Sequence, residues 1–132
     1  MSTAKADRSA RVWQRVENAI VALSILLTCL VMGQPWWMLF AAFPVFDLSV
    51  LGCLVNQRTG TLAYNVVHNY SAPAAVAAAS AVLMTNGFAG DLLFVLAACW
   101  AFHIGVDRAL GFGLKQGPFS ATHLSDRGAA GH

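Results

Sequence analysis

The side chains best suited to chemistry in this 132-residue sequence are acids and histidines placed inside apolar stretches. Asp47, His68 and His103 each lie in such a stretch, and Asp107 follows His103 by four residues, on the same face of a helix. Ionisable groups in a membrane-spanning segment are costly, so each is a functional candidate. Imidazole nitrogens and carboxylate oxygens suit zinc, and three protein ligands plus water are typical of catalytic zinc. The pattern therefore predicts a divalent metal site at these four residues.

Three of these residues share one predicted depth in the membrane. At a rise of about 1.5 Å per residue, Asp47 lies roughly 13 Å from the cytoplasmic end of its span. His68 lies about 12 Å from the start of the next span, and His103 roughly 13–15 Å from the end of the last one. Tyr64 and Asn65 lie one turn below His68, on its face. We therefore expect a polar pocket that opens toward the cytoplasm.

This pocket suggests a metal-dependent hydrolase that acts on a lipid-like substrate at the cytoplasmic leaflet. A metal-held water has a lowered pKa and attacks esters, amides or phosphates. Asp107 would be a fourth ligand or the general base. Tyr64 and Asn65 would orient the water or the substrate.

Basic residues lie where a lipid head group would sit. Arg58 and Arg108 are expected near the mouth of the pocket, where they would hold a phosphate. His123 lies in the C-terminal tail. It either folds back over the mouth or is an ordinary surface histidine.

Other interpretations of the polar cluster stay open. Its members would serve packing if they hydrogen-bond one another and fix the helix register. His68 and His103 would be the axial pair of a haem b. Asp47, His68 and Asp107 would relay protons or ions in a transporter, and four short spans would then need a homo-oligomer to enclose a path. In these cases the protein is not an enzyme.

The elements that must position these residues are membrane helices. Hydrophobic residues make up 58% of the chain and charged residues 11%, whereas a soluble domain carries about a quarter charged residues. We predict an all-α, polytopic four-helix bundle in the lipid bilayer, with no soluble catalytic domain and no nucleic-acid partner. Pro44 should kink the second span just before Asp47. The expected segments are a cytoplasmic N-terminal segment (1–17), spans at about 18–33, 35–56, 61–84 and 88–113, and a cytoplasmic tail (114–132).

The placement of the positive charges predicts the orientation. All eight Lys and Arg residues lie in the N-terminal segment, the second connector, the end of the last span or the tail. Lys and Arg mark the cytoplasmic side of a membrane. The sequence thus predicts a multi-pass protein of the inner membrane with both termini in the cytoplasm.

Several motifs occur together in these spans: the PVFDLS stretch at 44–49, YNVVHNY at 64–70, HIGVDRALGFGLK at 103–115 and THL at 122–124. This combination resembles a family of small bacterial integral membrane proteins classed as a domain of unknown function. The resemblance covers about Glu17 to Leu124. It implies a bacterial four-helix inner-membrane protein and supplies no activity. The family's motif positions include the pocket residues together with Thr122 and His123.

Overall fold

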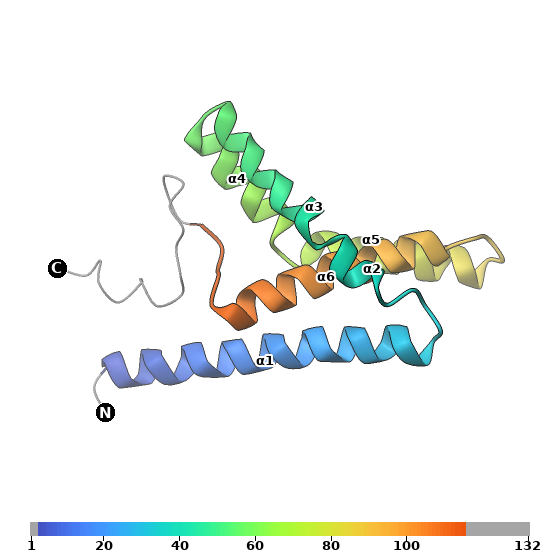
Figure 1. The fold of residues 1–132 in the computed structure, drawn as a ribbon, viewed down its shortest axis with the longest axis horizontal. Coiled ribbons are helices and arrows are strands. Elements are labelled where there is room, and N and C mark those ends of the chain that lie inside the picture. The colour runs from blue at the N-terminus through green and yellow to red at the C-terminus, as the bar shows by residue number, and fades with distance from the viewer. Residues whose placement is uncertain (1–2, 116–132) are drawn as a thin grey trace.

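The computed structural model describes residues 3–115, and its regular elements are helical (Figure 1). The expectation of an all-α chain is confirmed for this part of the sequence. In chain order the elements are α1 (Thr3–Val31), α2 (Met38–Ala41), α3 (Phe43–Asp47), the 3₁₀ helix η1 (Leu48–Leu54), α4 (Gln57–Val67), α5 (Ser71–Thr85) and α6 (Asp91–Leu110).

Two of these helices, α1 and α6, are long and apolar enough to cross a membrane. Helices α4 and α5 count as a third candidate if they form one span, which is then bent by 42°. The segment Met38–Leu54 is apolar but shorter. These lengths indicate a membrane protein with two to three clear candidate spans, and the predicted count of four stays a prediction.

Helix α1 begins far before the predicted start of the first span near residue 18. It is continuous from Thr3 through the basic N-terminal residues to Val31. Ala, Arg, Lys and Glu are strong helix formers, which explains why the polar segment continues the apolar helix. At the other end, Gly33 adopts a φ of +65° in the turn, a conformation that glycine accepts readily.

The second apolar segment is broken where a single kinked span was expected. Helix α2 ends at Ala41, and Pro44 lies in the first turn of α3. Proline has no N–H to donate, and its ring clashes with the carbonyl four residues earlier, so a continuous helix is interrupted here. Asp47 ends α3, and the chain continues as η1.

The third segment is also broken, between Val67 and Ser71, where the sequence suggested one helix. Asn69 replaces the missing helical hydrogen bonds. Its side-chain Nδ2 donates to the carbonyls of Asn65 (2.6 Å) and Val66 (2.9 Å). Its Oδ1 accepts from the backbone N–H of Ser71 at 2.9 Å. Asn69 thus closes one helix and opens the next, as short amide side chains do at turns.

Helix α6 supplies the remaining donors at this break. The indole Nε1 of Trp100 donates to the carbonyl of Val67 at 2.6 Å. The guanidinium Nη2 of Arg108 donates to the carbonyl of His68 at 3.3 Å. Four consecutive carbonyls that the break frees from the helix therefore all have donors, which an apolar setting requires.

Helix α6 is the centre of the packing, with α1 and α5 along it and α2 and α3 in contact with it. Helix α1 comes close to α6 at Gly105, where an added Cβ would lie 3.2 Å from the Ala22 Cβ. Small residues allow such close contact between helix backbones. The buried apolar core includes Cys29, Leu39 and Phe102. The hairpin of η1 and α4 extends away from this core (Figure 1).

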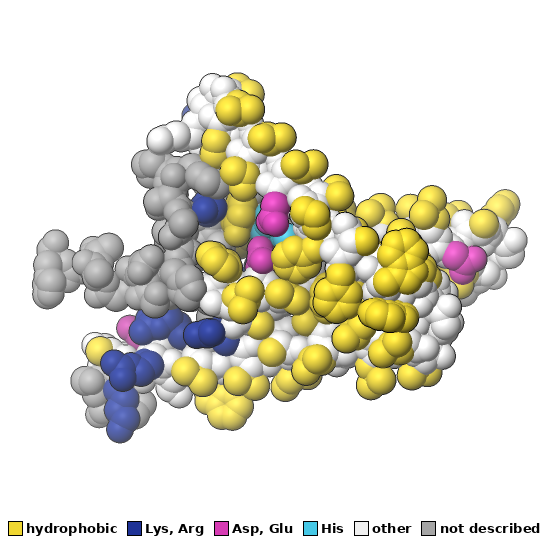
Figure 2. Space-filling view, in the orientation of Figure 1, with side chains coloured by type: hydrophobic (Ala, Val, Ile, Leu, Met, Phe, Trp, Pro, Cys, Tyr) yellow, Lys and Arg dark blue, Asp and Glu magenta, His cyan; other side chains and the backbone are white. Residues whose placement is uncertain are grey.

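The Lys and Arg side chains visible in Figure 2 gather on the side of the molecule where α1 begins and α6 ends. Hydrophobic side chains cover most of the remaining visible surface (Figure 2). The described basic residues thus gather toward one end of the molecule, and the orientation in the membrane stays a prediction.

Replacement of Asn69 by Ala tests the closed break. The Asn69→Ala variant leaves two carbonyls and one N–H without partners, so its free energy of unfolding should fall by roughly 2 kcal/mol. The matched control is Asn86→Ala, which loses one bond to the Val82 carbonyl at the exposed end of α5. Thermal unfolding in detergent measures both variants. Equal melting temperatures for the two would contradict this role of Asn69.

Candidate metal centre

Four side chains from three parts of the chain meet beside the broken helices. Asp47 comes from the end of α3, His68 from the residue that follows α4, and His103 and Asp107 from α6. One ligand atom of each residue lies within 4.8 Å of the corresponding atoms of the other three. The structure therefore brings together the full set of residues predicted as metal ligands, and this group can hold a metal ion.

The separations of the four atoms suit a small ion. The two imidazole Nε2 atoms are 3.0 Å apart. Asp107 Oδ2 is 3.4 Å from each of them, and Asp47 Oδ1 is 3.5 Å from His103 Nε2 and 3.9 Å from His68 Nε2. A tetrahedral zinc site with ligand distances of about 2.0–2.1 Å has edges of about 3.3–3.4 Å. Small movements of the side chains would therefore complete such a site.

His68 is held in the orientation that a metal ligand needs. Its Nδ1 lies 3.0 Å from the carbonyl oxygen of Tyr64. A carbonyl can only accept, so the imidazole carries its proton on Nδ1 and directs a bare Nε2 toward the cluster. The Tyr64 ring stacks on His68 with centroids 3.8 Å apart and planes 9° apart, which restricts rotation of the imidazole.

His103 is fully buried and is held by aromatic rings. The Phe43 ring centroid lies 4.2 Å away and the Phe46 centroid 5.4 Å away. Among the described residues, His103 Nδ1 has no hydrogen-bond partner. A His103 that binds a metal through Nε2 would carry its proton on Nδ1, and this N–H would need an acceptor. A His103 that donates from Nε2 to His68 has no proton on Nδ1 and needs none. This nitrogen alone therefore favours a plain histidine pair.

The charge of the cluster favours a cation. The two Nε2 atoms are 3.0 Å apart, so only one of them can carry a proton in this contact. At most one of the two imidazoles is therefore cationic. The two carboxylates bring two negative charges, and no Lys or Arg of the described chain forms an ion pair with either. An uncompensated charge in an apolar segment is expensive. A divalent ion with two neutral histidines makes the group neutral, so the charge of the cluster favours a bound ion.

The cluster reaches the surface on its Asp47 side. The Asp47 side chain is 53% exposed, whereas the Asp107 side chain is 16% exposed. Acidic side chains lie beside a histidine in the angle between the η1/α4 hairpin and the rest of the molecule (Figure 2). His68, Asp107, Arg108 and Phe112 line a small void that is too narrow for a water molecule. The predicted pocket is thus a small site with one open edge.

Tyr64 and Asn65 lie next to the cluster but are engaged with the chain that follows α6. Asn65 Nδ2 donates to the Lys115 carbonyl at 2.8 Å, and the Lys115 N–H donates to Asn65 Oδ1 at 2.7 Å. The Lys115 ammonium lies 4.7 Å from the centroid of the Tyr64 ring. Burial lowers the pKa of Lys115. Asn65 thus fastens the end of the described chain beside Tyr64.

Two of the three residues expected at the head group, Arg58 and Arg108, lie in different parts of the described chain. Arg108 is at the cluster, because it donates to the His68 carbonyl. Arg58 is in the first turn of α4, ten residues before His68 and about 15 Å away along the helix. His123 lies outside the described residues.

Two residues that the sequence analysis did not single out position the site. Trp100 and Asn69 satisfy the carbonyls beside His68, as described above. A signal for the break at Asn69 exists in the sequence, since Pro73 is tolerated in the first turn of a helix and so indicates a helix that begins near Ser71. Trp100 offers no comparable signal, because indole groups are common in apolar helices.

The model of a family described as a domain of unknown function, DUF4260, matches residues 11–126. The chain belongs to the DUF4260 family. The match includes all four residues of the candidate metal centre and confirms the resemblance drawn from the motifs. No curated protein and no solved structure matches this DUF4260 chain. Its function therefore has to be argued from the site itself.

A Trp100→Phe substitution tests how the site is supported. Phenylalanine keeps an aromatic ring near Phe46, on which Trp100 stacks at 5.7 Å, but it removes the donor to the Val67 carbonyl. An unsatisfied buried carbonyl should lower the free energy of unfolding by about 1–2 kcal/mol. Trp37→Phe, at an exposed residue, is the control and should change little. Thermal unfolding would count against this role if the two variants melted together.

Proposed function

We propose that the protein binds one divalent metal ion of the zinc type through Asp47, His68, His103 and Asp107. The observation that carries this proposal is the convergence of four ligand atoms from three separate segments within 4.8 Å. The hydrogen bond from His68 Nδ1 to a backbone carbonyl supports it, because metal-binding histidines are oriented in this way. The charge balance of the group supports it further.

We propose further that the site is a metal-dependent hydrolase for a lipid-like substrate. A bound divalent ion supplies a polarised carbonyl or phosphoryl group and a nucleophilic water at neutral pH. Asp107 is largely buried between two histidines, so it stays a ligand. Asp47 is the exposed member of the group. We assign to it the role of proton acceptor, since its carboxylate would take the proton of a water that the ion activates.

The neighbouring residues position the ligands and the mouth of the site. Tyr64 stacks on His68 and restricts its imidazole, which keeps Nε2 directed at the ion. Asn65 holds the Lys115 backbone beside the site, and we assign its amide to this task. Arg108 lines a polar compartment beside Asp107, and we assign its guanidinium to an anionic group of the substrate.

The geometry favours a small ion over haem. A haem requires its axial histidines on opposite faces of a wide planar ring. Here the carboxylates of Asp47 and Asp107 lie within 3.9 Å of the imidazole Nε2 atoms and fill that space. A relay or packing cluster is the competing proposal, favoured by the 3.0 Å contact of the two histidines and the lone Nδ1 of His103.

Elemental analysis of the protein purified in detergent, with no chelator present, tests the metal site. We expect about one zinc or similar ion per chain. The Asp107→Asn substitution keeps the size of the side chain but removes a charged ligand. Loss of an outer hydrogen-bond partner alone costs about 10–100-fold in metal affinity, so loss of this ligand should cost more than about 100-fold. Asp91→Asn, at the other end of α6, is the matched control and should keep the ion.

Acidification adds a second test of the same site. Metal ligands must be deprotonated, so binding releases protons and becomes weaker as the pH falls. Metal content should therefore decrease in acid and recover on return to neutral pH with added zinc. A well-folded protein without metal at neutral pH, even after addition of zinc, would leave the histidine pair as a structural or relay group.

Hydrolysis itself is tested with the zinc-loaded protein on lipid esters and phosphate esters in mixed micelles. Asp47→Asn should retain most of the metal, because the buried ligands remain, and should lower turnover by about 10²-fold or more through loss of the proton acceptor. An enzyme whose Asp47→Asn variant is as active as the unaltered protein would show that this carboxylate takes no part in the reaction.

A further inference from the structure

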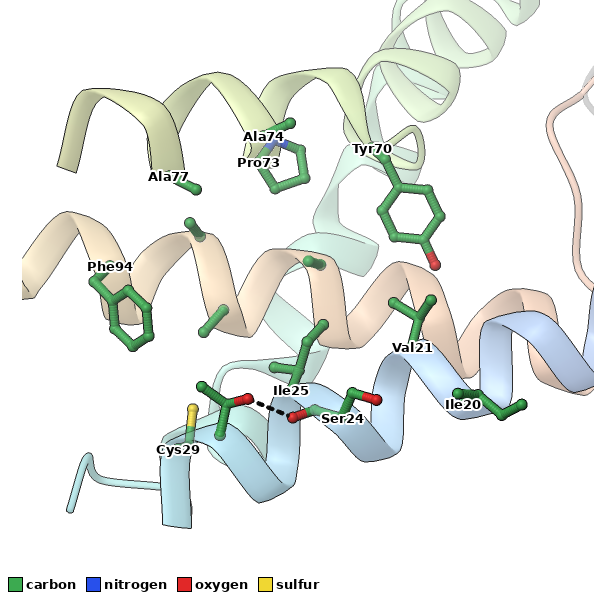
Figure 3. Close-up of a pocket in the computed structure, with 14 residues that line it drawn as sticks. Ile20, Val21, Ser24, Ile25, Cys29, Tyr70, Pro73, Ala74, Ala77 and Phe94 are labelled. Atoms are coloured by element: carbon green, nitrogen blue, oxygen red, sulfur yellow. Dashed lines mark hydrogen bonds between the residues drawn. The ribbon is translucent and has the colours of Figure 1, made fainter. Parts of the chain in front are cut away.

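A long groove runs along the molecule on the side where α1 and α5 both lie against α6. Its apolar part has a volume of about 440 Å³ and is lined by residues of all three helices (Figure 3). Ile25 of α1 and Ala74 of α5 lie on its two sides, Ile20 and Tyr70 lie at one end, and Phe94 lies toward the other (Figure 3). The small side chains of α5 leave this space open.

The apolar part continues into a polar compartment. The second cavity has a volume of about 580 Å³, and Val21 and Tyr70 line both cavities. The polar end is lined by Gln14, Glu17 and Arg108. The groove is therefore amphipathic along its length, with an apolar trough and a charged end.

The dimensions match one membrane leaflet. Along α1 the apolar part extends from Ile20 to Cys29, which corresponds to about 14 Å of helix. The hydrocarbon core of a bilayer is about 30 Å thick, so one leaflet contributes about 15 Å. The charged end lies on the side where the Lys and Arg residues gather, at the level expected for head groups.

The charges at the polar end are balanced. Arg108 offers a guanidinium whose Nε is buried and has no hydrogen-bond partner within the described part of the chain. Its Nη2 bond to the His68 carbonyl leaves further donors for an anion. Glu17 brings a carboxylate to the same compartment. One cation and one anion are complementary to a head group that carries both a phosphate and an amine.

We infer that this groove binds a single-chain amphiphile with a zwitterionic phosphoamine head group, with the acyl chain between α1, α5 and α6 and the phosphate at Arg108. Arg108, Phe112 and Gly113 line both the polar compartment and the small void beside His68 and Asp107. The head group therefore lies next to the candidate metal centre. That this amphiphile is the substrate class rests on the proposed hydrolase, whereas its binding requires no metal.

The test is a binding measurement on the full chain in a neutral detergent, by native mass spectrometry. The probe is a lysophosphatidylethanolamine with a 14-carbon chain, compared with dodecyl phosphate and an alkyl maltoside. Ala77→Leu fills the groove, and Ala75→Leu makes the same change at an exposed residue of α5 that does not line it. We expect the affinity for the probe to fall at least tenfold in Ala77→Leu and to stay unchanged in Ala75→Leu.

A Glu17→Gln variant tests the head group. It should reduce the preference for lysophosphatidylethanolamine over dodecyl phosphate several-fold, while Arg108→Gln should weaken both. Equal binding by Ala77→Leu and the unaltered protein would overturn the inference. A preference of the unaltered protein for dodecyl phosphate would also overturn it, because the site would then bind simple anions. A dimer that only Ala77→Leu dissociates would overturn it as well, because the groove would then bind a second copy of the chain.

The outcomes for the groove and for the metal site are separable. Binding of the probe by zinc-free protein, with no hydrolysis after zinc is restored, would retain the groove and remove the proposed activity. Zinc binding with hydrolysis of other esters, and no binding of the probe, would retain the activity and overturn the inference.

Discussion

The structure depends on one constraint: a helix that is broken in apolar surroundings must find a donor for every carbonyl that the break frees. Around residues 67–70 this need is met by one amide side chain and by two residues of α6. The bonds from Trp100 and Arg108 fix α4 and α5 against α6. Because the break is closed from two sides, it forms a rigid corner, and the residue at the corner is His68.

This corner explains how one cluster receives side chains from three segments. His68 follows the last residue of α4, and its side chain points toward α6, where His103 and Asp107 lie one turn apart. The break at Pro44 does the same for Asp47, because α3 is a short element that ends at this acid beside α6. Each interruption of a helix therefore places one member of the cluster, and α6 provides the other two on one face.

Residue types and spacing were sufficient to predict the all-helical class, the separation of positive charge and the four members of the cluster. Asp47 and His68 meet His103 although their segments are not the continuous helices that were expected, because both residues lie close to the points where these helices break. The breaks themselves were missed. Pro44 indicated only a kink, and Asn69 acts through bonds to carbonyls that a pattern of apolar residues does not reveal. The contribution of Trp100 depends on which helix packs against the break, and this is a property of the tertiary structure alone.

The order of the ligands along the chain has a consequence for biogenesis. Asp47 and His68 are synthesised well before His103 and Asp107, and the later pair belongs to the last helix of the described chain. A nascent chain that lacks α6 holds two isolated ligands and a break whose Val67 and His68 carbonyls have lost their donors. The centre can therefore be completed only after the final helix has reached its place. Metal binding would then occur only in the fully synthesised and folded protein. Truncated chains would expose the unpaired carbonyls at the break, which cellular quality control can recognise.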